Sequence, residues 1–286
     1  MSYHRPTQIA DVFEVLKLPG IQIVAGATDV FPANSKPALT GPVLDLTGIP
    51  GLCGISETTD GWRIGATTKW AELARAKLPP AFAALQTAAL QIGSPQIQNS
   101  ATVAGNLCNA SPAADGVPPL LVLDAMIELT SQTGARRCSL ETFILGVRKT
   151  ALRPGEIVTA IHIPARSVQG ASAFEKLGAR KYLVISICMV AVRINISGGK
   201  IDSAAISVGA CSPVATRLSA LEQQLVGAAS NDPESWESHL PEAVKSMLSP
   251  IADIRSDASY RLDAAVELTT KTIRGAIAAQ FGGTAH

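Results

Sequence analysis

Two segments rich in small residues could wrap closely around a phosphate-bearing ligand. The first, Val24 to Phe31, reads VAGATDVF and follows a short apolar run, and the second lies within Asn99 to Ala125. A pyrophosphate can be bound without Lys or Arg when tight turns point several backbone N–H groups at it. Small side chains permit that approach, and Gly26 is free to take a positive φ. The pair of segments therefore indicates a nucleotide site.

The second segment also supplies short hydrogen-bonding side chains, among them Asn106, Ser111 and Asp115. The same three residues equally fit caps of turns and of a helix expected at 117–123, and the first segment taken alone is more often an ordinary turn. Local chemistry leaves both interpretations open. Neither segment matches G-x-G-x-x-G, and no G-x-x-x-x-G-K-[ST] occurs, so a nicotinamide or ATP loop of those designs is not supported.

Composition excludes several function classes. The 286 residues carry a formal net charge of +1 and only 16% charged side chains, which argues against nucleic acid or an anionic membrane as the main partner. The longest apolar run is too short to span a bilayer, and the N-terminus lacks the apolar core of a secretion signal, so we expect a cytoplasmic protein. Neither the four histidines nor the five cysteines show ligand spacing, which predicts no metal, no iron–sulfur cluster and no disulfide within this chain.

Hydrophobic periodicity predicts an α+β protein whose elements must position the two segments. The first part alternates helices and strands. A second part, after a boundary near residue 170, reads as three antiparallel strands covered by three helices. The expected helices are 7–18, 70–76, 81–91, 117–123, 213–226, 233–248 and 259–280; the expected strands are 21–24, 42–46, 62–66, 126–129, 137–140, 156–163, 172–177, 185–194 and 200–209.

Three more short segments complete a family pattern: Arg148-Lys149-Thr150, Pro154 to Val158, and Phe174-Glu175-Lys176. With the two small-residue segments they resemble the FAD-binding medium subunit of molybdenum hydroxylases, in which A-G-G-T-D and T-[IV]-G-G-N-[IL]-x-x-A-S-P-A-A-D occupy the corresponding places. The resemblance covers nearly the whole chain. It implies a PCMH-type FAD-binding domain at 1–170 with lobes of about 1–55 and 56–170, followed at 171–286 by a smaller CO dehydrogenase flavoprotein-like C-terminal domain of antiparallel sheet and helices.

The same resemblance implies where FAD would bind. The first segment and the start of the second would hold the pyrophosphate and the adjoining ribityl or ribose groups, Asp115 would bond the ligand, and Ile157 and Lys176 would lie near the isoalloxazine. A cation at Lys176 would stabilise the anionic reduced flavin. No catalytic residue is expected in this chain, and the expected cofactor-binding residues are Val24, Ala25, Gly26, Ala27, Thr28, Asp29, Val30, Phe31, Ala101, Thr102, Val103, Ala104, Gly105, Asn106, Ser111, Asp115, Ile157 and Lys176.

Three residues depart from the family pattern. Ala27 and Ala104 stand where glycine is usual, and Leu183 stands where many members have aspartate. A methyl group is a modest intrusion as long as φ stays negative, so we expect binding to survive at both alanines.

The function implied by the resemblance is electron transfer. FAD in this chain would receive electrons from two iron–sulfur clusters on a small subunit and pass them to an external acceptor, while a large molybdopterin subunit hydroxylates the substrate, an N-heterocycle by preference. The expected assembly is a dimer of heterotrimers. Two alternatives stay open: a stand-alone PCMH-type FAD oxidoreductase, which often carries a histidine in the first turn where this chain has Thr28-Asp29, and a flavin-free scaffold subunit.

Overall fold

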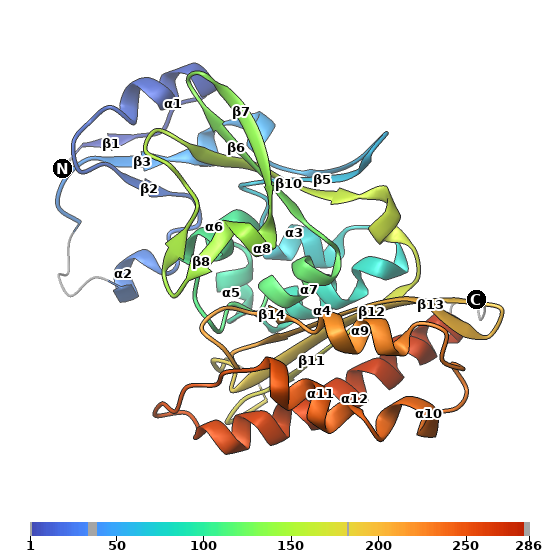
Figure 1. Ribbon diagram of the computed structural model, residues 1–286. Coiled ribbons are helices and arrows are strands. Elements are labelled where there is room, and N and C mark those ends of the chain that lie inside the picture. The colour runs from blue at the N-terminus through green and yellow to red at the C-terminus, as the bar shows by residue number, and fades with distance from the viewer. Residues whose placement is uncertain (1, 34–38, 182, 283–286) are drawn as a thin grey trace.

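The computed structural model describes residues 2–33, 39–181 and 183–282. The chain begins with a small parallel sheet whose strand order is β1-β3-β2, accompanied by two short helices (Figure 1). Apolar side chains of the first helix and of the central strand, Val12 and Leu44, form its buried core. These elements are β1 (Tyr3–His4), α1 (Ile9–Val15), β2 (Gln22–Val24), α2 (Val30–Ala33) and β3 (Val43–Asp45).

An antiparallel five-stranded sheet follows, with strand order β4-β5-β10-β6-β7. The last strand of this sheet in sequence, β10, lies in the middle between β5 and β6, and most of its residues are buried. The strands are β4 (Ile55–Thr58), β5 (Gly61–Gly65), β6 (Met126–Ser131), β7 (Gly134–Ser139) and β10 (Ile157–Pro164).

Helices cover one face of this sheet and form with it the largest buried cluster of the described residues, which includes Trp70, Phe82 and Phe143. A short hairpin, β8 (Ile144–Gly146) and β9 (Lys149–Thr150), lies beside them. The helices are α3 (Trp70–Arg75), α4 (Ala83–Gln91), α5 (Pro95–Gln98), α6 (Val103–Asn109), α7 (Val117–Val122) and α8 (Leu140–Phe143).

The C-terminal part is a four-stranded antiparallel sheet in the order β11-β12-β13-β14. Figure 1 shows the long helix α12 beneath this sheet and α4 and α7 on the opposite side. The elements are β11 (Ala171–Leu177), β12 (Cys188–Ser197), β13 (Lys200–Gly209), β14 (Thr216–Arg217), α9 (Ser219–Leu225), α10 (Glu234–Glu237), α11 (Leu240–Met247) and α12 (Ala258–Gly282).

Strand β12 shows why this sheet is apolar on both faces. Alternate residues point to opposite sides, so Val190 and Val192 join the core between the sheet and the C-terminal helices. Met189 and Ala191 face the other way, toward Ala84 and Ala88 of α4. Small side chains on that side let the sheet and α4 approach closely. This contact joins the N-terminal and C-terminal halves of the molecule.

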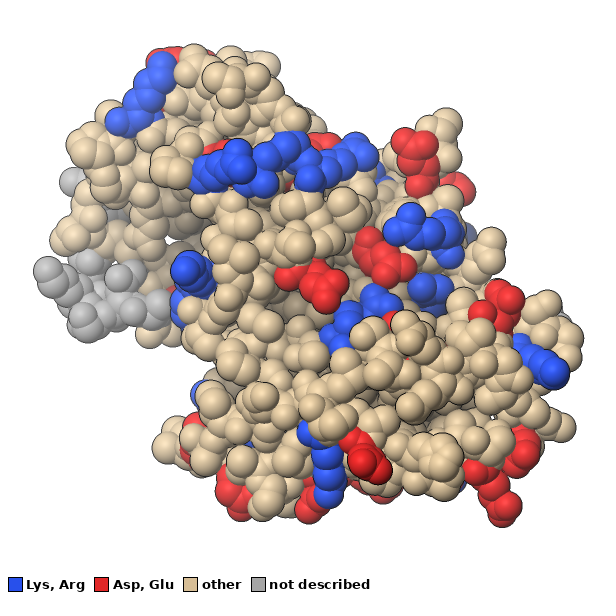
Figure 2. Space-filling view, viewed as in Figure 1, with Lys and Arg blue, Asp and Glu red and all other residues tan. Residues whose placement is uncertain are grey.

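The α+β class is confirmed, and most expected elements are present within a few residues. The structure corrects four details: the N-terminus forms strand β1, the strand expected at 185–194 begins only at Cys188, the helix expected at 213–226 is shortened to α9 behind strand β14, and the segment 233–248 forms two helices, α10 and α11. In the described residues no helix is both long and apolar enough to span a bilayer. On the face drawn in Figure 2, acidic and basic side chains are interspersed.

Candidate functional site

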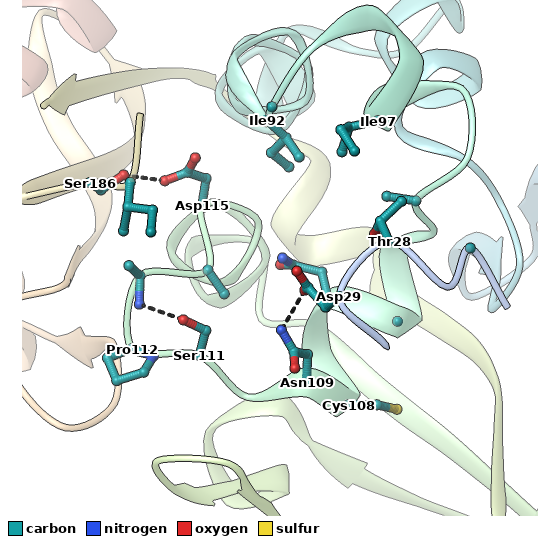
Figure 3. Close-up of a pocket in the computed structure, with 18 of the residues that line it drawn as sticks. Thr28, Asp29, Ile92, Ile97, Cys108, Asn109, Ser111, Pro112, Asp115 and Ser186 are labelled. Carbon is teal, nitrogen blue, oxygen red and sulfur yellow. Dashed lines mark hydrogen bonds between the residues drawn. The ribbon is translucent and has the colours of Figure 1, made fainter. Parts of the chain in front are cut away.

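A cleft of about 880 Å³ lies between the parallel sheet, the helices that cover the five-stranded sheet, and loops of the C-terminal part. This volume is at the upper end of the range typical of sites for small molecules and cofactors. Its walls come from the segment after β2, from the region of α5 and α6, from the loop before α7, from residues 183–186, and from the loop that precedes α12. Figure 3 shows Thr28 and Asp29 on one side of the space and Asp115 and Ser186 on another.

The first small-residue segment packs directly against the second. A Cβ atom added at Gly26 would lie 2.3 Å from the carbonyl oxygen of Ser100 and 2.6 Å from the Cα of Ala101. No side chain fits in that space, so glycine is required here by the contact between the two segments. Sequence analysis singled out Gly26 for its conformational freedom. The structure shows that glycine is needed because the backbones approach closely at this position.

The positive φ of the first turn belongs to Ala27 and not to Gly26. Ala27 has a φ of +55°, whereas Gly26 is not among the described residues with a positive φ. The sequence left Gly26 free to take a positive φ and made binding at Ala27 conditional on a negative φ, and the structure does not meet that condition at Ala27. An L-residue with a side chain pays a steric cost in this region, which explains why glycine is usual at this position in the family pattern.

The second segment begins as a helix and not as a second turn. Thr102 caps α6, its Oγ accepting a hydrogen bond from the backbone N–H of Gly105 at 3.1 Å. The side chains of Val103 and Ala104 point into the buried core beside α3 and β5. The methyl group of Ala104 therefore fills core space in a helix of ordinary backbone conformation, and its φ is not positive.

Asp115 is held in a buried polar cluster at the far end of the cleft. The Lys176 ammonium donates to one carboxylate oxygen at 2.5 Å, and the Ser186 hydroxyl donates to the other (Figure 3). Only 8% of the Asp115 side chain and 7% of the Lys176 side chain are exposed. Burial raises the pKa of Asp115 above its ordinary value, although Lys176 and Ser186 act in the opposite direction.

Most of the expected cofactor-binding residues line this one cleft. They are Val24, Ala25, Gly26, Ala27, Thr28, Asp29, Val30, Ala101, Thr102, Gly105, Asn106, Ser111 and Asp115. The others are elsewhere. Val103 and Ala104 are in the core, and Lys176 reaches the site only through Asp115. Phe31 belongs to α2, and its side chain lies outside the described part of the structure.

Ile157, expected near the isoalloxazine, lies in a separate buried cluster. Its side chain is 2% exposed and packs with Val12, Leu46 and Leu52 beneath the parallel sheet. It is not among the residues that line the cleft. Its position at the start of β10 accounts for this burial.

A polar chain that the sequence did not predict crosses the cleft. The Asn109 amide donates to the Asp29 carboxylate at 2.6 Å (Figure 3), and the Arg148 guanidinium donates to the backbone carbonyl of Asn109 at 3.1 Å. It ties the first segment, the end of α6 and the β8–β9 hairpin together. Arg148 is part of the segments that carry the resemblance but was given no role, and Asn109 falls at an unspecified position of the second family pattern.

The cleft has apolar walls that sequence analysis also missed. Ile92 precedes α5 and Ile97 lies within it, and Cys108 adds a thiol. Cys108 is exposed and lines the cleft. These residues follow ordinary helical patterns, so only the folded arrangement identifies them.

Polar atoms at the cleft are available to a ligand. In the described structure, the backbone N–H groups of Gly26 through Asp29 have no hydrogen-bond acceptor. The Asn106 Oδ1, Trp70 Nε1 and Arg261 Nε atoms are buried without a partner, and all three residues line the cleft. Buried polar groups are normally satisfied, so this arrangement fits a large ligand that carries both donors and acceptors, such as a dinucleotide.

Several residues with strained backbone conformations line the cleft. Among the described residues, Ala27, Ala110, Asp124, Arg148, Leu183 and Ala210 are the non-glycine residues with positive φ. Four of the six line the cleft, and Ala110 lies between Asn109 and Ser111, which also line it. Strained backbone lowers stability and persists only where the surrounding structure enforces it, and such residues cluster at active and ligand-binding sites.

Comparison with known families covers both halves of the chain. Residues 1–166 match the family described as the FAD binding domain in molybdopterin dehydrogenase. Residues 172–276 match the family described as the CO dehydrogenase flavoprotein C-terminal domain.

Individual proteins are similar over almost the full length. The putative xanthine dehydrogenase FAD-binding subunit of Escherichia coli K12 is 31% identical over 98% of this chain and 97% of its own. The carbon monoxide dehydrogenase medium chain of Afipia carboxidovorans is 34% identical over 91% of this chain and 90% of its own. The solved structure of reconstituted CO dehydrogenase from Oligotropha carboxidovorans contains a chain with a TM-score of 0.89 and 30% identity, with 98% of both chains covered.

Proposed function

The chain belongs to the family defined by the FAD-binding domain of molybdopterin dehydrogenases, and from this premise we propose how its residues hold FAD and which proteins it works with. It is an oxidoreductase component, the flavoprotein subunit of a molybdenum-containing dehydrogenase. The bound flavin supplies the ability to exchange electrons singly on one side and in pairs on the other. The chain's own residues bind and orient it.

The pyrophosphate is held by the unpartnered backbone N–H groups of Gly26 through Asp29. Gly26 supports this role because its contact with Ser100 brings the first segment against the second. The Asn109 side chain fixes Asp29 from across the cleft, so the turn is held in place before ligand binds. Preorganised N–H donors bind an anion without a free cation.

The isoalloxazine end lies toward Asp115. Lys176 acts as a positioning residue: its ammonium donates to one oxygen of the buried Asp115 carboxyl group, and the Ser186 hydroxyl holds the other oxygen. A carboxylate held in this way can accept hydrogen bonds from a flavin ring. Ile92 and Ile97 offer apolar surface for flat rings along the same cleft.

The observation that carries this proposal is the meeting of two distant segments, 24–30 and 101–115, around one cleft with unpartnered N–H groups. Its test is purification of a tagged chain from its native cell. We expect two further chains to copurify, a small one with two iron–sulfur clusters and a large one with molybdopterin. Metal analysis that finds neither iron nor molybdenum with a flavin-loaded chain would instead identify a stand-alone oxidoreductase.

We propose further that the assembly is a cytoplasmic dimer of heterotrimers and that its substrate is an N-heterocycle. Relatives named for xanthine, nicotine and caffeine support the substrate class, although relatives named for carbon monoxide and glyceraldehyde widen the range. Turnover by the purified complex distinguishes these substrates, and its mass in solution tests the assembly.

A further inference from the structure

Two of the five cysteines meet at the ends of neighbouring strands. Cys188 opens β12, and Cys211 follows β13, which pairs with β12 as far as Met189 and Gly209. Both side chains are fully buried in the core between the C-terminal sheet and its helices. Both are free thiols, and their wide spacing along the chain did not reveal a pair. Only the fold brings the two sulfurs into one apolar environment.

A strained residue places Cys211 on the same side of the sheet as Cys188. In a regular strand, the residues at 208 and 210 would point to the same face. Here Val208 lies in that core, whereas Ala210 has a φ of +63° and packs with Met189 on the opposite face. The alternation is broken at this point, so Cys211 returns to the side of Cys188. A left-handed alanine costs stability and persists only where the surrounding structure enforces it.

Arg261 of α12 ties the two cysteine-bearing segments together. Its Nη1 atom donates to the carbonyl of Ile187 at 2.6 Å and to the carbonyl of Ala210 at 2.8 Å. These are the residues directly before the two cysteines. The Cys211 thiol donates in turn to the backbone carbonyl of Arg261 at 3.6 Å. One arginine therefore fixes both segments next to the sulfurs.

The two thiols differ in acidity. Cys188 donates a hydrogen bond to the Cys211 sulfur, and this bond, together with burial, raises the pKa of Cys188. The same bond lowers the pKa of Cys211, and the Arg261 guanidinium acts in the same direction although burial opposes it. The thiolate is the nucleophilic form of cysteine, and a neighbouring cation favours it. Cys211 is therefore the sulfur better suited to react first.

The pair lies directly behind the wall of the cleft. The residues on either side of Cys211, Ala210 and Ser212, line the cleft. Ser186 lines it as well, two residues before Cys188. A bond between the two sulfurs would therefore act on two parts of the cleft wall.

We propose that Cys188 and Cys211 form a redox-active dithiol that a peroxide closes to a disulfide, and that closure weakens FAD binding in the adjoining cleft. In the first step, the Cys211 thiolate attacks one peroxide oxygen, which forms an S–O bond, breaks the O–O bond and releases one water. The Cys188 sulfur then attacks the Cys211 sulfur, the S–S bond forms, and the oxygen leaves as a second water. The two sulfurs are oxidised, the two peroxide oxygens are reduced, and the two thiol protons end in the two water molecules.

The effect on the cleft follows from the shortness of the new bond. A disulfide is much shorter than the contact between two hydrogen-bonded sulfurs, so closure draws the two segments together. The Ser186 hydroxyl, which donates to Asp115, moves with the Cys188 segment. Loss of that hydrogen bond leaves the Asp115 carboxyl group less well positioned for the ligand. This effect on FAD rests on the proposed function, whereas formation of the disulfide does not.

The test treats the reduced full chain with hydrogen peroxide and maps its disulfides. Trypsin cleaves after Arg193 and Lys200, so the two cysteines fall on separate peptides, 182–193 and 201–217. Mass spectrometry of the non-reduced digest should find these two peptides joined, and dithiothreitol should separate them. The proposal is overturned if Cys188 and Cys211 stay free, pair with other cysteines, or are oxidised without forming a disulfide. This measurement needs no variant and so does not depend on the folding of one.

The affinity for FAD, measured by the fluorescence that flavin regains on release, is the second readout. The oxidised parent should bind FAD about tenfold more weakly than the reduced parent, as loss of a hydrogen bond to a buried carboxyl group predicts, and dithiothreitol should restore the affinity. Equal affinity before and after a verified disulfide would overturn the link to the cleft.

Variants separate the pair from the other thiols, with circular dichroism as the check on folding. Cys188→Ala and Cys211→Ala retain the exposed Cys108, and they should bind FAD as the reduced parent does, with no response to peroxide. Cys138→Ala, at a half-buried thiol outside the pair, is the matched control and should respond as the parent does. A response to peroxide that persists in both pair variants would overturn the assignment. A chain that binds no FAD in either state would count against the proposed function, and the disulfide map would still decide the dithiol.

Discussion

At the scale of single residues, Gly26 and Ala27 satisfy two different constraints of the first turn. Gly26 leaves room for the backbone of Ser100, whereas Ala27 occupies a left-handed conformation. The family pattern has glycine at both positions and so does not separate the two reasons. Only the dihedral angles and the contact distance assign each requirement to its residue.

A pair of substitutions tests the strain at Ala27. Ala27→Val should destabilise the protein by about 1–2 kcal/mol, because a β-branched residue is poorly tolerated at positive φ. Ala27→Gly should stay within about 1 kcal/mol of the parent, since relief of strain is offset by the entropy of the unfolded glycine. Urea unfolding measures both, and equal stability of the two variants would mean that φ at this position is not positive in solution.

Asp115→Asn tests the buried ion pair at the cleft. The change keeps the shape of the side chain but leaves the Lys176 ammonium without a counter-charge, so we expect a loss of about 3 kcal/mol or more. Replacing Asp115 and Lys176 together by Asn and Met should recover part of this loss. Additive losses in the double variant would show that the two side chains do not interact.

At the scale of elements, Arg136 on β7 is clamped to the start of β10. Its guanidinium donates to both carboxylate oxygens of Glu156 at 2.7 and 2.8 Å and to the carbonyl of Ala151 at 2.9 Å. The hydrogen bonds from Arg136 are the main cause of the lowered pKa of Glu156. This contact secures the edge strand of the five-stranded sheet.

The clamp predicts an acid-sensitive contribution to stability. Because the pKa of Glu156 is lower in the folded than in the unfolded chain, the unfolded chain takes up the proton first as pH falls below the ordinary value of 4.5. The stabilisation is therefore complete above that pH and is lost below it. Glu156→Gln should lower stability at pH 7 by about 1–2 kcal/mol and flatten the profile below pH 5. Thermal melts from pH 3 to 7 check this prediction. If the melting temperatures of the parent and of Glu156→Gln depended on pH in the same way, the proposed contribution of Glu156 would be contradicted.

Element patterns also show how far the sequence could predict this structure. The alternation in β6 and β7 and the helical spacing of α4 were visible because each depends on local periodicity. Helix α6 was expected as a turn, since its residues are small and its start depends on the Thr102 cap. The placement of Ile157 could not be read locally, because it depends on α1 packing against another sheet.

At the scale of the whole molecule, Asp124 joins the two halves. Its carboxylate accepts from Arg217 of β14 at 2.9 Å and from Ser167 at 2.6 Å, and Arg193 of β12 lies at 3.5 Å. Burial pushes the pKa of Asp124 upward, but these hydrogen bonds and charges hold it below its ordinary value. No sequence motif revealed this link, because its members are far apart along the chain.

Asp124→Asn measures this link without altering the backbone, since asparagine also tolerates the positive φ of this position. We expect a loss of about 1–3 kcal/mol, because two buried guanidinium groups lose their shared counter-charge. Asp202→Asn is the control, because Asp202 is exposed and its carboxylate accepts a hydrogen bond from the neutral Asn195 amide at 3.1 Å. Denaturant unfolding that gives equal stability for the two variants would contradict a role for Asp124 in joining the halves.

The central claim is that this cleft binds FAD, and the flavin content of the purified chain tests it most directly. The flavin is measured by its absorbance near 450 nm and identified after it is released from the protein. The account predicts about one FAD per parent chain, as a single dinucleotide cleft requires. Gly26→Ala should lose most of it, because the new Cβ would lie 2.3 Å from the Ser100 carbonyl oxygen, whereas Gly51→Ala, with open space around its Cα, should retain it. A folded parent chain without flavin, or a Gly26→Ala chain with full flavin content, would contradict the assignment of the cofactor to this cleft.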